Sequence, residues 1–483
     1  MSTIPREARI IEAPALPVHA EPDHRSGLFP LDPFASPDQD DPALRAFLHQ
    51  ASDLLCHWIG SASMGLPLPT VRPQPAVAPT VEGLGMDRLL KDLQLVMDGA
   101  YQPSHPGALA HLDPPPLTAS IAADLICAGL NNNLLAEELS PGLTNLEQQL
   151  CGWFCQRLGL PDGAGGVLAS GGTLSNLMAL VAARVHSGAR DGVILCSQDA
   201  HVSLQKSALV MGLADDALQP IPVGSDGALR TDALEQALQA LRSSGRPCLA
   251  VVATAGTTVR GAIDPLAAMA AICRRDGVWM HVDAAIGGVF ALAEPFAQLM
   301  DGLNRADSIT INPQKLLGIT KTSSLLLLRD RSWLQRTFST GLPYMELPCG
   351  DHHGGEVGLQ GTRPAEVLKL WLGLRQLGER GIATVLRTAL ERRTRLKSLL
   401  PADRLLVLDG GLHLLVFRPR TSDPGISEQW TEDTRQRLLR EGFLLSRPRY
   451  QGHHWLKVVL GNPHTTTAHL HRLAALVDDQ IPC

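Results

Sequence analysis

Lys315 is the residue of this sequence whose surroundings most favour covalent chemistry. The chain has only seven lysines, and Lys315 follows an expected strand and Pro313 and precedes Leu316 and Leu317 rather than polar residues. An amine in apolar surroundings has a lowered pKa and is available as a nucleophile. Lys321 is the nearest rival, and a lysine that extends its amine into solvent is the structural alternative.

A carboxylate, Asp283, ends the apolar run 278–283, which has the composition of a buried strand. Ligands of open α/β sheets bind at the carboxyl ends of strands, and a buried carboxylate without a partner is costly. We therefore expect Asp283 to meet a cationic or proton-bearing group. The alternative is an N-cap for the segment that follows.

Residues 167–184 have the pattern of a strand, a glycine turn and a helix, with Gly171, Gly172 and Thr173 at the turn. Bare glycines before a helix expose backbone N–H groups where the helix dipole favours an anion such as a phosphate. A tight connection with a helix cap is the equal alternative. No complete nucleotide-binding glycine motif is present in the sequence.

Strands and helices alternate between residues 99 and 378, which predicts an α/β fold with a mainly parallel sheet covered on both faces. We expect three parts: an N-terminal arm, helix and proline-rich linker at 1–100, a large domain at 101–375, and a smaller α+β domain at 376–483. The expected strands include 193–197, 248–254, 278–283, 308–312 and 323–329, with a helix at 265–275.

The composition argues against several classes of partner. The 483 residues carry a formal net charge of −6, so no basic field favours nucleic acid. Prolines and charges interrupt the first 20 residues, and there is no apolar run long enough for a membrane span, so we expect a cytoplasmic protein with no membrane partner. The nine cysteines form no C-x-x-C pair, so we expect reduced thiols and no metal site.

An anion-binding turn, a buried acid and a nucleophilic lysine together meet the needs of pyridoxal phosphate. The turn would hold the phosphate, the acid would keep the pyridine nitrogen protonated, and the lysine would form a Schiff base with the aldehyde. From about Ser104 onward, the chain also resembles the group II pyridoxal-phosphate-dependent amino acid decarboxylases, which include glutamate, cysteine sulfinate, 2,4-diaminobutyrate and aromatic amino acid decarboxylases. The motifs that carry this resemblance are SHPGALAHLDPPP, LSPGLTNLE, SGGTLSNLMAL, AHVSLQKSA, VVATAGTTVRGAIDPL, WMHVDAAIGG, ADSITINPQK and LQGTRPAEVLKLWLGLRQLG.

The resemblance implies a role for each residue that matches a family motif. Lys315 would carry the cofactor as a Schiff base, and Asp283 would pair with its ring nitrogen. His201 would stack on the ring and face the substrate carboxylate. Further cofactor contacts would come from Gly172, Thr173 and Asn312 at the phosphate, and from Thr258 near Asp283.

Four other positions complete the comparison with the family: two match its substrate-pocket and loop positions, and two depart from its pattern. His111 matches a substrate-pocket position, and Tyr344, one of only three tyrosines, matches the loop tyrosine that protonates the substrate carbon after carbon dioxide leaves. Gln314 stands where the family usually has histidine; it can hydrogen-bond the cofactor or substrate but cannot become cationic. Lys457 stands where relatives commonly have an arginine that meets the substrate, so the bidentate carboxylate fork is missing.

The resemblance implies a fold-type-I homodimer with shared active sites that decarboxylates an L-amino acid to an amine. Two alternatives stay open: another chemistry at Cα, such as transamination or aldehyde formation, and a non-catalytic relative that acts as a binding protein. The substrate also stays open among glutamate, aspartate, cysteine sulfinate, diaminobutyrate and aromatic amino acids. His111, Lys457 and the scarcity of aromatic residues favour a small polar or acidic one.

Overall fold

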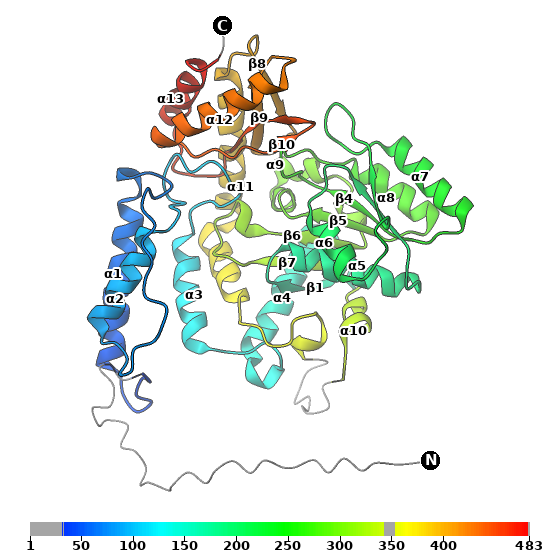
Figure 1. Cartoon of the computed structure of the whole chain (residues 1–483). Helices are drawn as coiled ribbons and strands as arrows, with labels where there is room; N and C mark the ends of the chain where they lie inside the picture. Colours follow the sequence, from blue (N-terminus) through cyan, green and yellow to red (C-terminus); the bar gives the residue numbers. More distant parts are fainter. Residues whose placement is uncertain (1–30, 32, 342–352, 482–483) are drawn as a thin grey trace, which may run out of the picture. The chain divides into compact units, whose positions relative to one another are not determined.

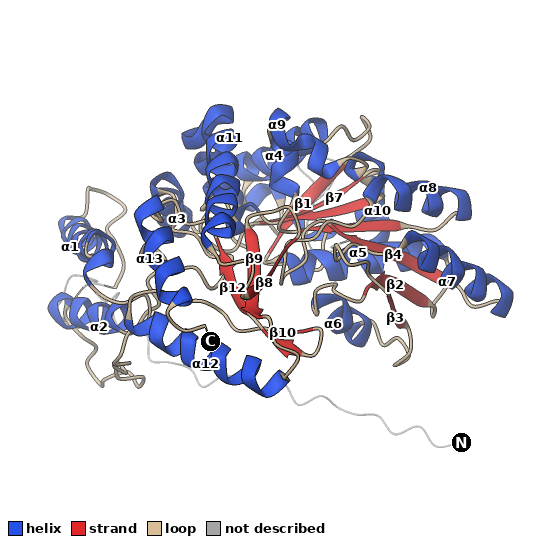
Figure 2. Ribbon diagram, turned by 90° about the horizontal axis from the view of Figure 1, so that it is seen from above, coloured by secondary structure: helices blue, strands red, loops and turns tan. Residues whose placement is uncertain are grey.

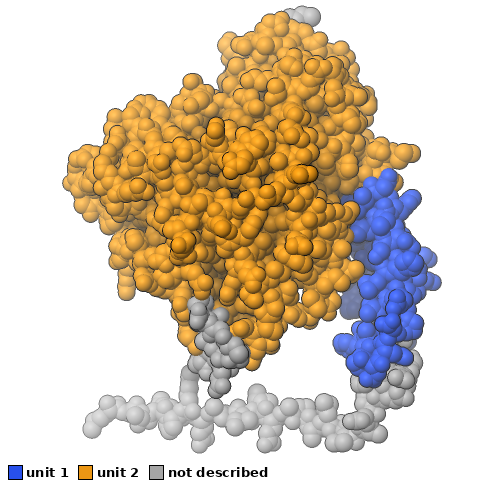
Figure 3. All heavy atoms as spheres, turned by 180° about the vertical axis from the view of Figure 1, so that it is seen from behind, with its two compact units in different colours: residues 1–60, 69–100 blue, residues 61–68, 101–483 orange. Residues whose placement is uncertain are grey.

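The computed structural model describes residues 31, 33–341 and 353–481 of the chain. It divides into two compact units, one of residues 1–60 and 69–100 and one of residues 61–68 and 101–483, which Figure 3 shows in different colours. No helix among the described residues is both long enough and apolar enough to cross a membrane.

The described residues of the first unit form two helices, α1 (Pro42–Gly60) and α2 (Met86–Asp98). Asp41 caps α1: its Oδ1 accepts hydrogen bonds from the backbone N–H groups of Ala43 at 2.8 Å and Leu44 at 3.0 Å. The indole N–H of Trp58 donates to the carbonyl of Met97 at 3.0 Å and ties the two helices together.

The second unit is built on a seven-stranded sheet with the order β1-β7-β6-β5-β4-β2-β3 (Figure 1). Strands β2 to β6 pair in parallel, whereas β7 runs antiparallel to both β6 and β1. The predicted α/β fold with a mainly parallel sheet is confirmed. The strands are β1 (Gly165–Ala169), β2 (Val193–Ser197), β3 (Leu218–Ile221), β4 (Cys248–Thr254), β5 (Met280–Ala284), β6 (Ser308–Ile311) and β7 (Ser324–Leu328).

Helices cover both faces of this sheet (Figure 2). Successive side chains of a strand point to opposite faces, so alternate residues of the central strands join two separate apolar clusters. One face packs against α5 (Gly172–Ser187), α6 (Ser203–Val210) and α10 (Ser332–Phe338). The other packs against α4 (Pro141–Arg157), α7 (Thr231–Ser244), α8 (Leu266–Asp276) and the first part of α11 (Val367–Leu399). Two further helices of this unit are α3 (Thr118–Leu130) and α9 (Glu294–Ala297).

A third apolar cluster lies around a three-stranded antiparallel sheet near the C-terminus. Helix α11 leads into it and is interrupted at Gly378, whose φ of 60° is not helical. Whether this interruption separates a large from a small domain, as the sequence suggested for residue 376, stays a prediction. The elements here are β8 (Leu405–Asp409), β9 (Leu414–Pro419), α12 (Pro424–Arg440), β10 (Arg449–Tyr450), β11 (His453–His454), β12 (Leu456–Val459) and α13 (Thr467–Asp478).

The segment just before His111 is bonded to this C-terminal sheet. The backbone N–H of Leu109 donates to Leu444 at 3.1 Å, and the N–H of Val459 donates to the carbonyl of Leu109 at 2.8 Å. The approach is close: a Cβ atom on Gly107 would lie 1.9 Å from the carbonyl oxygen of Gly442, so only glycine fits. This pairing brings His111 to the sheet that carries Lys457.

Candidate active site

A cavity of about 180 Å³ opens at the carboxyl ends of the parallel strands. This is the edge where ligands of open α/β sheets bind. It collects the predicted lysine, aspartate, histidine and phosphate-site residues, which come from segments far apart in the sequence. The cavity is lined by Gly172, Thr173, Asn176, His201, Thr254, Gly256, Thr258, Asp283, Ala285, Ile286, Asn312 and Lys315.

Lys315 ends a single 3₁₀ turn (Pro313–Lys315) directly after β6. Its backbone N–H donates to the carbonyl of Asn312 at 3.0 Å, which holds the turn closed. The side chain is half-buried. Burial lowers the pKa of the Lys315 amine, while the negative charges of Asp283 and Asp113 act in the opposite direction. A lysine of this kind has more of its amine in the neutral, nucleophilic form than an exposed one.

Asp283 is buried near the end of β5 and already has two hydrogen-bond donors. Asn176 Nδ2 donates to its Oδ2 at 2.8 Å, and the backbone N–H of Ala285 donates to its Oδ1 at 3.2 Å. Two donors favour the charged form of a carboxylate. The Asp283 carboxylate therefore borders the cavity in a fixed orientation and can accept a hydrogen bond from a cationic or N–H group of a ligand.

The glycine turn and Asn312 form one wall with the features of an anion site. Gly171 has a φ of 96°, which favours glycine, and it starts α5 so that Gly172 and Thr173 in the first turn face the cavity. With its amide oxygen turned to this helix, Asn312 accepts from the N–H of Gly172 at 3.3 Å. Thr254 Oγ1 is buried without a partner among the described residues, so the wall still has a polar atom for a ligand to satisfy.

His201 lies in the segment between β2 and α6. Its Nδ1 accepts from the backbone N–H of Ser203 at 3.2 Å, so a neutral ring carries its proton on Nε2. Partial burial lowers the pKa of His201; Lys315 acts in the same direction and Asp283 opposes it. A hydrogen bond from the C-terminal part of the chain also fixes this segment: the Tyr450 hydroxyl donates to Asp199 Oδ2 at 2.7 Å.

Lys457 and His111 do not line the cavity, but Lys457 interacts electrostatically with Lys315 in its wall, and His111 interacts with Lys457. Burial lowers the pKa of Lys457 to about 8, and the positive charge of Lys315 adds to that shift while Asp113 opposes it. Lys457 Nζ donates one long hydrogen bond, 3.4 Å, to the carbonyl of Thr258. His111 is exposed, and Asp113 forms an ion pair with Lys321 at 2.7 Å.

Two further predicted site residues, besides Lys457 and His111, are not among those that line the cavity. Gln314 is half-buried but does not line it; its Oε1 accepts a hydrogen bond from the backbone N–H of Ser323. Tyr344 lies outside the described residues. The roles of both stay predictions.

The structure adds residues that the sequence reasoning missed. Asn176 and Thr254 line the cavity, and Asp113 influences the amines of Lys315 and Lys457. Asn176 had a recognisable signal, because it follows Thr173 by three residues on a helix that begins at the glycine turn. Thr254 and Asp113 had none beyond their positions near expected motifs.

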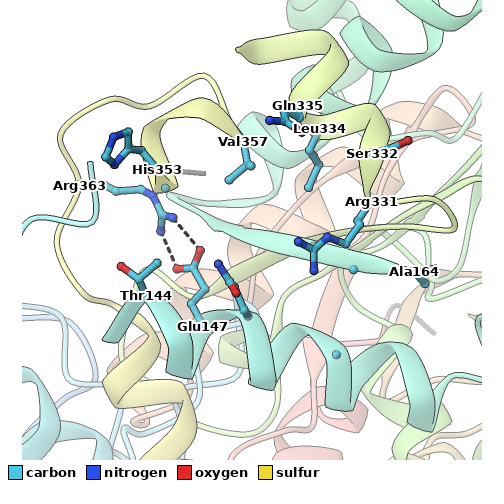
Figure 4. Close-up of a pocket in the computed structure, with 15 residues that line it drawn as sticks. Thr144, Glu147, Ala164, Arg331, Ser332, Leu334, Gln335, His353, Val357 and Arg363 are labelled. Carbon is cyan, nitrogen blue, oxygen red and sulfur yellow. Dashed lines mark hydrogen bonds and ion pairs between the residues drawn. The ribbon is translucent and has the colours of Figure 1, made fainter. Parts of the chain in front are cut away.

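A second cavity, of about 340 Å³, lies between α4, the start of β1 and α10 (Figure 4). Arg363 points into it and forms two hydrogen bonds of 2.6 Å with the carboxylate of Glu147, and both side chains are buried. The cavity is larger than the one at the strand ends but contains none of the predicted catalytic groups. The mutual pairing of its charges indicates a structural role.

Comparisons with known proteins agree with this geometry. Residues 72–420 match the family model described as the pyridoxal-dependent decarboxylase conserved domain. The chain belongs to this family. The match covers the glycine turn, Asp283 and Lys315, and it starts before the first motif that carried the resemblance in the sequence.

Two relatives of this decarboxylase bear the name L-2,4-diaminobutyrate decarboxylase. The chain is 33% identical over 402 residues to the L-2,4-diaminobutyrate decarboxylase of Rhizobium meliloti (strain 1021), an alignment that covers 81% of each chain. It is 32% identical over 329 residues to the L-2,4-diaminobutyrate decarboxylase of Acinetobacter baumannii, covering 62% of this chain and 64% of that protein.

Solved structures support the same fold and cofactor. The crystal structure of Oryza sativa TDC with PLP and tryptamine matches with a TM-score of 0.86 and 25% identity, over 92% of this chain and 99% of that one. Mouse CSAD matches with a TM-score of 0.85 and 24% identity, over 91% and 99%, which shows the fold. The cofactor is pyridoxal phosphate, and the enzyme belongs to the carboxy-lyases that act on amino acids.

Proposed function

We propose that this enzyme removes the α-carboxylate of a short, polar L-amino acid and that the cavity at the strand ends is its active site. The single observation that carries the proposal is the convergence of Lys315, Asp283 and the first turn of α5 on one cavity. Bound pyridoxal phosphate supplies an aldehyde for covalent attachment and a ring that accepts electrons. The remaining steps are carried out by side chains of this chain.

Each wall of the cavity has a task in this proposal. Lys315 provides the amine that attaches the cofactor, and Asp283 holds a proton at the ring nitrogen. The first turn of α5 and Asn312 bind the phosphate, while Thr258 and the ring of His201 support and cover the cofactor ring. Gln314 donates to the cofactor or substrate through its amide N–H groups, because its Oε1 already accepts from the backbone N–H of Ser323.

The charges beside the cavity support a short substrate with a second charged group. Lys457 supplies a buried cation for the α-carboxylate, and His111 lies on the same side of the site. Asp113 offers a carboxylate to a distal ammonium group, although Lys321 competes for it. Together with the two diaminobutyrate decarboxylases among the relatives, this makes L-2,4-diaminobutyrate the first substrate to test. Cysteine sulfinate and glutamate are the rivals if Lys457 and Lys321 dominate.

Tyr344 is proposed to return a proton to the substrate carbon after carbon dioxide leaves. The support is its match to the family's loop tyrosine. Without this proton donor, the Tyr344→Phe variant is expected to form less amine or to form aldehyde. Unchanged amine formation would remove the assigned role.

The protein is further proposed to act as a cytoplasmic homodimer with shared sites. Apolar side chains on α3 and α6 support an interface: Leu125, Ile126 and Leu130 on α3 and Leu209 and Val210 on α6 are exposed. All seven cysteines that the structure describes are free thiols, which suits a reducing compartment. Light scattering of the purified protein and cell fractionation test the two proposals.

The deciding experiment replaces Lys315 and follows product formation. Lys315→Ala is expected to lose the Schiff-base absorption band and to lower carbon dioxide release by at least about a thousandfold, because a covalent anchor is removed. Lys321→Ala is the matched control and should keep the absorption band. A Lys315→Ala protein with both the band and the activity would contradict the proposal.

A substrate panel completes the test. Carbon dioxide, ammonia and peroxide are measured with diaminobutyrate, cysteine sulfinate, glutamate, aspartate and aromatic amino acids. Carbon dioxide with amine identifies a decarboxylase, whereas ammonia and peroxide identify an aldehyde-forming enzyme. Bound cofactor without turnover on any amino acid would indicate a binding protein.

A further inference from the structure

A row of buried polar side chains lies behind Asp283, on the side away from the cavity. Trp279 directly precedes β5, and His281 and Asp283 lie within it. The three residues are spaced two apart, so they share one face of the strand. That face packs against α5, which carries Asn176. The neighbouring strand β6 pairs Ser308 directly with His281.

These five side chains form one continuous chain of hydrogen bonds. Trp279 Nε1 lies 2.9 Å from Ser308 Oγ, and Ser308 Oγ lies 2.9 Å from His281 Nδ1. His281 Nε2 lies 3.1 Å from Asn176 Oδ1, and Asn176 Nδ2 lies 2.8 Å from Asp283 Oδ2. The second N–H of the Asn176 amide is directed to Ser203 Oγ at 2.9 Å.

The two ends of this chain allow only one direction of donation. An indole N–H can only donate, so Ser308 accepts from Trp279, and it gives its own proton to His281 Nδ1 when the ring is neutral and carries its proton on Nε2. His281 then carries its proton on Nε2 and donates to Asn176 Oδ1. At the other end an ionised Asp283 can only accept, which turns the amide N–H of Asn176 toward it.

His281 is suited to this arrangement because it stays neutral. Its side chain is fully buried, and burial lowers its pKa, although Asp283 opposes this. A protonated ring would place an N–H on both nitrogens. Ser308 would then face two donors, and the order of the chain would be lost.

We propose that Asn176 and His281 are positioning residues that keep Asp283 an ionised hydrogen-bond acceptor aimed at the cofactor ring. This inference rests on the proposed role of Asp283. The donor from Asn176 stabilises the anion, so the proton between Asp283 and the ring nitrogen stays on the ring. His281 holds the Asn176 amide in the orientation that makes this possible.

The first test compares two neighbouring positions on α5. In Asn176→Ala the carboxylate loses a donor, so the nitrogen of ¹⁵N-labelled pyridoxal phosphate is expected to shift toward its unprotonated resonance, and the cofactor should bind about tenfold more weakly or worse. Ser175→Ala is the matched control, because Ser175 is equally buried and its hydroxyl has no partner among the described residues. Both readouts should match the wild type in the control.

The second test replaces the imidazole ring of His281 with side chains that either can or cannot continue the hydrogen bonds in the same direction. His281→Gln offers an N–H to Asn176 and a carbonyl to Ser308, so the resonance is expected to stay near the wild-type value. His281→Phe offers neither and is expected to shift the resonance in the same direction as Asn176→Ala. This pair keeps the inference testable even if Asn176→Ala does not fold.

Asp283→Asn separates failure of this inference from failure of the proposed role of Asp283. If Asp283→Asn leaves the ring-nitrogen resonance unchanged, Asp283 does not hold that proton, and the proposed role fails. If Asp283→Asn shifts the resonance but Asn176→Ala and His281→Phe do not, the role stands and the positioning inference is overturned. A shift in all three, with wild-type values in His281→Gln and Ser175→Ala, supports it.

Discussion

The two sides of the active site differ in how far the protein satisfies its own polar groups. On the Asp283 side, each group behind the carboxylate has a buried partner, and the hydrogen bonds run through α5, β5 and β6. On the Lys457 side, a buried amine has one long hydrogen bond, 3.4 Å, to a carbonyl. The Tyr101 hydroxyl, whose pKa is raised by burial and by the same Asp113 that acts on Lys457, is buried without a partner among the described residues. The first side is organised in advance, whereas the second leaves groups for a ligand to pair.

This difference predicts that substitutions on the Lys457 side weaken substrate binding but not cofactor binding. Lys457→Met removes the cation for the α-carboxylate, so KM is expected to rise by about tenfold or more, since hydrogen bonds to charged groups contribute about 1.5–3 kcal/mol. Lys457→Arg keeps the charge and should restore most of the affinity. Steady-state kinetics and cofactor dissociation constants are measured together. Weaker cofactor binding in Lys457→Met, with KM unchanged, would remove the distinction between the two sides.

The lowered pKa of Lys457 predicts a basic limb in the pH profile. Lys457 is cationic below its pKa of about 8 and neutral above it, so kcat/KM should fall as the pH rises through about 8. Lys457→Arg stays charged and should lose this limb, while any limb from the substrate amine remains. A limb that persists unchanged in Lys457→Arg would assign it to another group.

Asp113 provides a finer test, because its negative charge raises the pKa of Lys457 whereas burial lowers it. Asp113→Asn removes a negative charge that raises the pKa of Lys457, so the basic limb should move to lower pH. We expect a shift of less than about one pH unit, since Asp113 is the smallest of the three influences on this pKa. Asp215→Asn, at an exposed position, is the control. A shift to higher pH would contradict the sign.

The smallest expected effect concerns the tyrosine that anchors the His201 segment. Tyr450→Phe leaves the partly buried Asp199 without its donor at 2.7 Å, so the free energy of unfolding should fall by about 1 kcal/mol. Tyr101→Phe removes a hydroxyl without a partner among the described residues and should leave stability unchanged. Denaturant unfolding measures both. A rise in KM for Tyr101→Phe would place its hydroxyl on the substrate.

The local chemistry of the cofactor site was largely readable from the sequence. The apolar runs 193–197 and 248–254 coincide with β2 and β4, and the glycine turn lies between β1 and α5 as expected. Strand periodicity and turn residues depend on near neighbours, so such features can be deduced without a structure. The ends of parallel strands meet at one edge, and this brings Asp283 and Lys315 together.

Only the tertiary structure decided which distant groups surround that chemistry. The pairing of residues 107–109 with the C-terminal sheet brings His111 near Lys457, and the Tyr450–Asp199 hydrogen bond joins two other remote segments. The tertiary structure also shows that the amide oxygen of Gln314 accepts a hydrogen bond from the backbone N–H of Ser323. Such contacts depend on how complete elements pack, and no local pattern in the sequence encodes them. The row behind Asp283 combines both: alternation places Trp279, His281 and Asp283 on one face, and packing supplies Asn176 and Ser308.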